Sequence, residues 1–280
     1  MDNFDNIKKI LTSTFEVDLF DASLASLNDQ TNKLRYNNFA YSIRELSRHF
    51  LYSLSPEVNI KKCAWFKIET KDDKTTRAQR IKYAIQGGVT DDVLKKWGFD
   101  TDQLKKNIRR LLNTIDSLSK YTHINPDVFD LDKIDILTKS TDVLNAFKIF
   151  VETIDEYRGK LKSFLDEHIE EHMVVSIVSE YFENIDSLAP HYSLDDCEVT
   201  DYNVLQITDC EIIVFITGII SVTLLYGSNQ ERREGDGHDI EQSFPFETSI
   251  RYEISEDFPL GHYDIDDYGI DTSESFGEDR

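Results

Sequence analysis

Apolar residues recur at helical spacing through the first two thirds of the chain. The clearest stripe advances by four, three and four residues: Phe39, Ile43, Leu46 and Phe50. Such a stripe predicts a helix over residues 31–54 that buries one face. Pro56 ends this helix, because proline cannot donate the next hydrogen bond of the helical ladder.

Shorter helical patterns follow between recognisable stop signals. We predict helices over residues 76–86, 90–97 and 101–120, and Gly87 and Gly98 end the first two. The longest pattern covers residues 142–188, with apolar side chains at steps of three or four. A pattern of this length predicts one long bundle helix or two helices that meet near Met173.

The spacing changes after Pro190. Residues 197–207, 211–226 and 243–255 are rich in β-branched and aromatic residues and are predicted to form strands, with Thr208 and Asp209 as a hairpin turn. The sequence therefore predicts an α+β protein in which an N-terminal helical bundle precedes a small antiparallel β-sheet domain. We expect a helical domain over residues 1–190, an acidic β domain over 191–262 and a disordered acidic tail over 263–280.

The most apolar segment, residues 212–226, could be mistaken for a membrane span. It has only 15 residues, Thr217 and Gly218 interrupt it, and its flanks are acidic. A bilayer span needs about 20 apolar residues. We therefore predict a bent or bulged buried strand, or two strands that meet at Gly218, and no membrane contact.

Charge divides the chain into unlike halves. The net charge is −22, yet residues 1–150 carry 24 Lys and Arg against 21 Asp and Glu. Residues 151–280 carry 7 against 32, so this half would repel phosphate. Any nucleic-acid contact is expected in the first half, while the second half suits a basic protein partner or covers the basic surface of the chain itself.

Cysteine usage indicates the compartment. Cys63, Cys197 and Cys210 are far apart and odd in number, which fits reduced thiols rather than a disulfide framework. No signal-peptide pattern opens the printed sequence. We expect a cytoplasmic protein.

Arg44 and His49 form the first candidate catalytic pair. Cleavage of RNA by its own 2′-hydroxyl needs a proton carrier near neutral pH, such as His, and a cation to hold the phosphorane charge, such as Arg. The spacing is similar to that of HEPN-type ribonucleases, which need no metal and commonly pair two chains. On an ideal helix the two side chains point about 140° apart. The alternative is a solvated Arg44 and a His49 packed beside the apolar stripe.

A second candidate group lies past the end of the helix predicted over residues 101–120. His123 is a further candidate acid or base there, and Lys120 a candidate nucleic-acid contact. A cation at this position also stabilises a helix C-terminus without any further role.

A basic run interleaved with aromatic residues is the candidate nucleic-acid surface. Its cations include Lys61, Lys62, Arg77, Arg80 and Lys82, with Trp65, Phe66 and Tyr83 among them. Bases stack on such rings while the cations hold phosphates. The alternative is a mixed-charge surface over aromatic core residues.

The sequence predicts no metal site and no cofactor. His168 and His172 match the His-x-x-Glu-His pattern of some zinc proteases. Both follow the apolar stripe of a long helix, however, and no third ligand is apparent, so we interpret them as core residues.

Most of the chain resembles a known family. The segments FAYSIRELSRHFLYSLSP, AWFKIETKDDKTTRAQRIKYAIQGG, LLNTIDSLSKYTHINPDVF and ITGIISVTLLYGSNQERREGDGHDIEQSFPFE resemble bacterial proteins described as predicted pPIWI-associating nucleases. The resemblance implies the bacterial cytoplasm and a role in defence against foreign nucleic acid, beside partner proteins of the same locus. It assigns no catalytic residue, and Glu45 departs from the residues that often follow the Arg of HEPN enzymes.

Two functional hypotheses result. In the first, the chain is a nuclease that cuts RNA with Arg44 and His49, across a homodimer. In the second, it is a non-catalytic module of a defence system that binds nucleic acid or a partner protein. The candidate site residues and the basic run favour the first hypothesis, and the strongly acidic charge of the chain favours the second.

Overall fold

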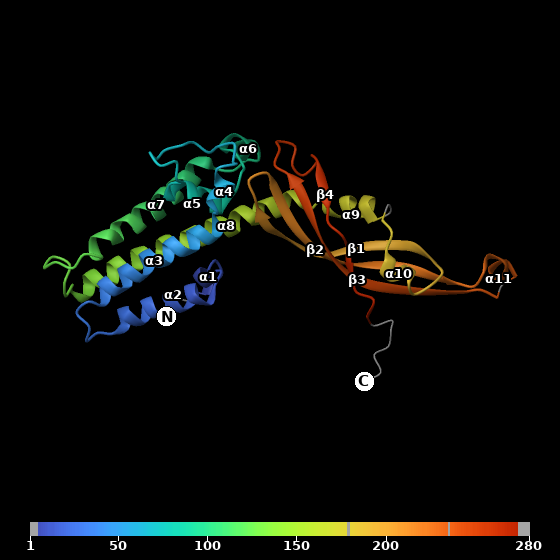
Figure 1. Cartoon of the computed structure of the whole chain (residues 1–280), viewed down its shortest axis with the longest axis horizontal. Coiled ribbons are helices and arrows are strands. Elements are labelled where there is room, and N and C mark those ends of the chain that lie inside the picture. Colours follow the sequence, from blue (N-terminus) through green and yellow to red (C-terminus); the bar gives the residue numbers. More distant parts are fainter. Residues whose placement is uncertain (1–4, 178–179, 235, 274–280) are drawn as a thin grey trace. The chain divides into compact units, whose positions relative to one another are not determined.

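The computed structural model describes residues 5–177, 180–234 and 236–273. The chain divides into two compact units, Met1–Arg158 and Gly159–Arg280, each of which is described by itself (Figure 1). The α+β class is as predicted, with helices first and an antiparallel sheet after them.

The first unit is helical. Its elements are α1 (Asp5–Lys8), α2 (Thr14–Asn28), α3 (Arg35–Leu54), α4 (Glu57–Ile60), α5 (Arg77–Gln86), α6 (Asp91–Lys96), α7 (Thr101–Leu118), the 3₁₀ helix η1 (Ser119–Tyr121) and most of α8 (Lys133–Leu165), whose residues from Gly159 on belong to the second unit. Helix α3 packs against α2, α5 and α7 and buries the stripe predicted for it. Phe50, fully buried, contacts Phe147 and Phe150 of α8 at ring-centroid distances of 5.7 and 6.1 Å.

Local sequence sets the starts and ends of the short helices. The Thr76 hydroxyl accepts from the backbone N–H of Gln79, whose side chain accepts from the N–H of Thr76, and this capping box starts α5. Gly87 ends α5 at a φ of +55°, a conformation that favours glycine. These boundaries confirm the prediction for residues 76–86.

The long helical pattern has different limits from those predicted. Helix α8 begins at Lys133, where the Asp132 carboxylate accepts from the N–H groups of Ile134 and Asp135. The chain then turns at residues 166–168 before α9 (Ile169–Ile177) and α10 (Glu183–Asp186). The predicted break near Met173 is therefore wrong. Met173 is fully buried within α9, whereas Asp166 in the turn accepts a hydrogen bond from the Tyr202 hydroxyl.

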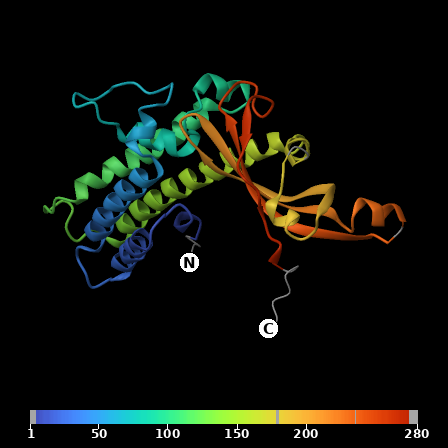
Figure 2. The same ribbon diagram turned by 45° about the vertical axis from the view of Figure 1, so that its right-hand side comes forward.

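The second unit contains one antiparallel sheet (Figures 1 and 2). Its strands are β1 (His191–Ile207), β2 (Glu211–Tyr226), β3 (His238–Glu253), β4 (Tyr263–Ile265) and β5 (Gly269–Ile270), and the order is β1-β2-β3-β4 with β5 also paired to β3. Helix α11 (Asn229–Glu234) lies at the far end of the long β2–β3 hairpin, orange in Figure 2.

The β1–β2 turn is confirmed, and the end of the chain differs from expectation. The backbone N–H of Thr208 donates to the carbonyl of Glu211 across the predicted turn. Residues 263–273, expected to be disordered, contain β4 and β5, because both strands pair with β3. Residues 274–280, the remainder of the expected tail, lie outside the described residues.

The apolar segment 212–226 lies within one continuous strand, β2. Gly218 neither bends nor divides the strand; the register shifts that were expected here occur in the neighbouring β1. A Cβ atom at position 218 would lie 2.4 Å from the Glu198 carbonyl oxygen and 2.5 Å from the Phe246 ring. Close packing therefore explains the glycine. Within the described residues, no helix combines the length and apolar character that a membrane crossing requires.

Candidate nucleic-acid interface

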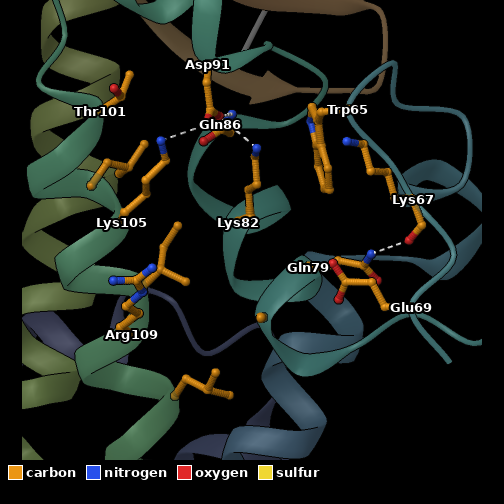
Figure 3. Close-up of a pocket in the computed structure, with 14 residues that line it drawn as sticks. Trp65, Lys67, Glu69, Gln79, Lys82, Gln86, Asp91, Thr101, Lys105 and Arg109 are labelled. Atoms are coloured by element: carbon orange, nitrogen blue, oxygen red, sulfur yellow. Dashed lines mark hydrogen bonds and ion pairs between the residues drawn. The ribbon is translucent and has the colours of Figure 1, made fainter.

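The first unit contains a pocket of about 420 Å³ between α5, α7 and the segment that precedes α5 (Figure 3). Its charged lining consists of Lys67, Lys82, Lys105 and Arg109 with Glu69 and Asp91, so cations outnumber carboxylates by four to two. We call this the cationic pocket. Trp65 forms one wall, and apolar side chains of α7, including Leu104 and Ile108, also line the pocket.

The Trp65 ring is fixed in place by the fold around it. Its indole N–H donates to the carbonyl of Gly87 at 2.8 Å, and its ring packs against a small core of Ile60, Cys63 and Tyr83. The Lys82 Nζ lies 4.7 Å from the ring centroid, within cation–π range. Gly87, directly after α5, therefore positions the aromatic wall of the pocket through its carbonyl group.

Asp91 ties two of the four cations together. Its carboxylate lies 2.7 Å from the Nζ of Lys82 and 3.4 Å from the Nζ of Lys105, and accepts from the Gln86 amide at 3.3 Å. Burial alone would raise the pKa of Asp91, but the two lysines and Gln86 outweigh it and lower the pKa. Asp91 is thus held as a carboxylate that orients Lys82 and Lys105 toward the pocket.

The other two cations are less constrained. Arg109 and Lys67 are both exposed at the pocket. Among the described residues, neither has a carboxylate within ion-pair distance. A phosphate in the pocket could therefore pair with Lys67 and Arg109, in addition to the two lysines that Asp91 orients.

Of the six predicted nucleic-acid-binding residues, Lys82 lines this pocket. Lys61 forms an ion pair with Glu57 at 2.6 Å, Lys62 is exposed, and Arg77 pairs with Asp116 of α7. Lys120 is exposed, with its Nζ 5.9 Å from the Tyr121 ring centroid.

Arg80 has a structural role in this geometry. Its side chain is only 4% exposed. The guanidinium donates to the Ser55 carbonyl at 2.6 Å, pairs with Glu57 at 3.3 Å and lies 3.7 Å from the Tyr52 ring centroid. A phosphate would have to displace these contacts to reach it. Arg80 therefore joins α5 to the end of α3.

Sequence reasoning missed Lys105 and Arg109 because they come from a different helix than the basic run. Their spacing of four residues on α7 places both on one helix face. The sequence could have indicated these two residues through that spacing, which predicts a cationic helix face. It could not have indicated that Trp65 lies at the same pocket.

The candidate catalytic residues contact different neighbours. The Arg44 Nε donates to the Ser119 hydroxyl of η1 at 3.2 Å, and its guanidinium lies 3.5 Å from the Glu45 carboxylate. His49 meets Phe15 of α2 edge to face, with ring centroids 5.1 Å apart. Arg44 and His49 thus turn to different sides of α3, in line with the angle expected on a helix.

His123 is exposed in the turn after η1. No hydrogen bond or ring contact joins any two of Arg44, His49 and His123, all of which lie within the described residues. Within one copy of the chain, these three side chains therefore have no direct contact with one another.

The His-x-x-Glu-His pattern belongs to the second unit. His172 is buried in α9, its Nδ1 forms a 2.9 Å hydrogen bond with the Tyr252 hydroxyl, and its ring stacks on Tyr263 at 4.4 Å. Burial lowers the pKa of His172, with the nearby His168 adding to the effect. Across the part of the chain that the structure describes, no group of three or more His, Cys, Asp or Glu residues is placed to hold a metal ion.

Comparison with known proteins identifies the family. Two family models, each described as a predicted pPIWI-associating nuclease, match residues 8–147 and 154–276. The chain belongs to this family. No curated protein and no solved structure gave a match. The two matched segments correspond closely to the two compact units, and the cationic pocket of this predicted pPIWI-associating nuclease lies wholly within the first.

Proposed function

We propose that this member of the predicted pPIWI-associating nuclease family binds single-stranded RNA at the cationic pocket and acts as a nuclease on foreign RNA. One observation carries the binding proposal. A fixed aromatic ring, Trp65, stands beside four cationic side chains around a pocket of about 420 Å³.

The dimensions and the chemistry of the pocket suit a nucleotide unit of a single strand. An unpaired base can stack on Trp65, whereas a base inside a duplex cannot reach it. The phosphates on either side of that base would meet Lys67 and Arg109, with Lys82 and Lys105 already oriented by Asp91. Backbone contacts of this kind bind many sequences, so the site suits recognition of a strand rather than of one sequence.

The setting of this activity comes from the family. Membership supports a role in bacterial defence, in the cytoplasm, alongside a partner protein of the same locus. The alternative is a non-catalytic module in which the cationic pocket binds nucleic acid for a separate nuclease.

For cleavage we propose Arg44 as the phosphate-binding cation and His49 as the acid or base, in a site completed by a second copy of the chain. The support is chemical, because this pair can cut RNA without a metal. Arg44 also retains a side chain 34% exposed, so it can contact a substrate or a second copy.

Paired glutamine substitutions test the binding proposal. We expect Lys67→Gln with Arg109→Gln to weaken binding of a fluorescent fifteen-nucleotide single-stranded RNA by about tenfold or more, measured by anisotropy. The slope of log K against log salt should fall by about 1.4, since two phosphate contacts are lost.

The matched control removes two charges away from the pocket. Lys95→Gln with Lys148→Gln changes the net charge equally, and both side chains are 58% exposed. Binding by this control should change less than twofold. If both pairs weaken binding equally, the pocket has no special role and only general charge attraction remains.

A further inference from the structure

Strand β1 has an unusual repeat in the second unit. Its pairing with β2 shifts register at three places, between 194 and 196, 199 and 201, and 204 and 206. Strand β1 therefore has one extra residue relative to β2 at every fifth position, namely Asp195, Thr200 and Leu205. Each is a β-bulge in which two residues of β1 oppose one of β2.

The bulges turn extra side chains outward. The less exposed residues of β1 occur at steps of two and three and form its inner side: Tyr192, Leu194, Cys197, Val199, Tyr202, Val204 and Ile207. At each bulge two consecutive residues are exposed on the outer side instead. Asp195 with Asp196, Thr200 with Asp201 and Leu205 with Gln206 are these pairs, and the first two place three carboxylates on this face.

The outer face of the β1–β2–β3 sheet is correspondingly acidic. The register of the strands places nine carboxylates on it: Asp195, Asp196, Glu198 and Asp201 of β1, Glu211 of β2, and Asp239, Glu241, Glu247 and Glu253 of β3. The strands contribute one Lys or Arg to this face, Arg251, and Asp266 holds it through two hydrogen bonds of 2.9 and 3.0 Å. We call this surface the acidic sheet face.

A row with little charge runs between the two acidic strands. Along β2 the outer side chains include Ile213, Phe215, Thr217 and Ile219, and Ile219 is 39% exposed. Adjacent strands lie about 4.8 Å apart, so the carboxylate rows of β1 and β3 are roughly 10 Å apart. That spacing accommodates one extended peptide over β2 with cationic side chains that reach both rows.

A lysine of the same unit already binds the β1 row. The Lys162 Nζ lies 3.2 Å from the Asp201 carboxylate and 4.6 Å from the Tyr202 ring centroid. This cation lowers the pKa of Asp201, mainly through its hydrogen bond. The contact shows the chemistry by which the face would hold a foreign cation.

We infer that the acidic sheet face is a docking surface for a lysine- and arginine-rich segment of a partner protein. Charge complementarity selects this partner, because the carboxylates repel nucleic acid and acidic proteins. The bulges also break the regular outer edge of β1, so the segment lies across the face rather than adding a strand to the sheet. This inference is independent of RNA binding at the cationic pocket.

The test uses the full chain and a fluorescein-labelled decapeptide of alternating arginine and valine. Asp196→Asn, Glu198→Gln and Glu247→Gln together should raise the Kd of this peptide by about tenfold. The control set Glu167→Gln, Glu170→Gln and Asp257→Asn removes the same charge from exposed positions elsewhere in this unit. The control should change the Kd less than twofold, and both sets should keep the wild-type melting temperature.

Three outcomes would overturn the inference. One is no peptide binding by the wild-type chain, and another is an equal loss in both sets, which would show attraction by net charge alone. The third is that the three substitutions on the acidic sheet face leave peptide binding unchanged and tighten RNA binding. That result would make the basic half of the chain itself the occupant of the face.

Discussion

Arg44 and His49 present the sharpest question at the scale of single residues. If they form a ribonuclease site, His49→Ala should reduce RNA cleavage by about a hundred- to ten-thousand-fold, the usual contribution of a placed acid or base. Arg44→Lys should also fail, because an ammonium does not reproduce the guanidinium fork. Cleavage should persist in EDTA and leave a 2′,3′-cyclic phosphate, and gel analysis of RNA digests measures both.

The neighbouring Arg48 supplies the control for this experiment. It is 59% exposed, lies on the same helix and pairs only with Glu45 among the described residues, so Arg48→Gln should retain activity. Melting curves are needed for His49→Ala, since it also loses the Phe15 contact. If EDTA stops cleavage and His49→Ala does not reduce it, Arg44 and His49 are not the catalytic pair, and the site depends on a metal.

Residue types located a basic and aromatic segment, but they did not show which contacts each of its residues makes. Arg80 looked like the other cations of the basic run, but its guanidinium is enclosed by Ser55, Glu57 and Tyr52. Burial of this kind depends on which helices meet, and periodicity along one segment does not show that. The same reason explains why Lys105 and Arg109 were missed, since only the packing of α7 beside α5 brings them to Trp65.

At the scale of elements, helix boundaries followed from local signals where a cap or a glycine was present. Thr76 and Gly87 set the limits of α5 as predicted. The turn after α8 lacks such a signal in its own sequence, and its Asp166 contact with Tyr202 involves a residue 36 positions away. A bend or bulge was expected in β2 at Gly218, but the bulges occur in β1. Gly218 instead leaves room for the Phe246 ring.

Gly218 gives a test of that packing. Gly218→Ala should destabilise the protein by about 1–3 kcal/mol, because the added methyl group overlaps the Glu198 carbonyl and the Phe246 ring. At Gly159, in α8, an added methyl group would meet nothing within 4 Å, so Gly159→Ala should be neutral or stabilise by up to about 1 kcal/mol. Urea unfolding followed by circular dichroism compares the two, and a neutral Gly218→Ala would refute the close-packing explanation.

At the scale of the whole molecule, the two halves have opposite effects on a nucleic acid. The cationic pocket lies in the half with 24 Lys and Arg against 21 Asp and Glu. The other half, with 7 Lys and Arg against 32 Asp and Glu, includes the acidic sheet face. The chain therefore combines a local attraction for phosphate with a net charge of −22 that opposes it. If the cationic pocket binds RNA as proposed, we expect a basic partner that neutralises the second half to strengthen this binding.

We expect residues 1–190 alone to bind single-stranded RNA more tightly than the full chain, because removal of the sheet removes most of the repulsion. The difference should be largest at low salt, where the Debye length is about 30 Å at 0.01 M, and should vanish near 1 M, where it is about 3 Å. Anisotropy titrations of both proteins over this range measure it, with circular dichroism as the check that the shorter chain keeps its helices. Equal affinities at low salt, from a folded shorter chain, would show that the acidic half does not oppose binding at the cationic pocket.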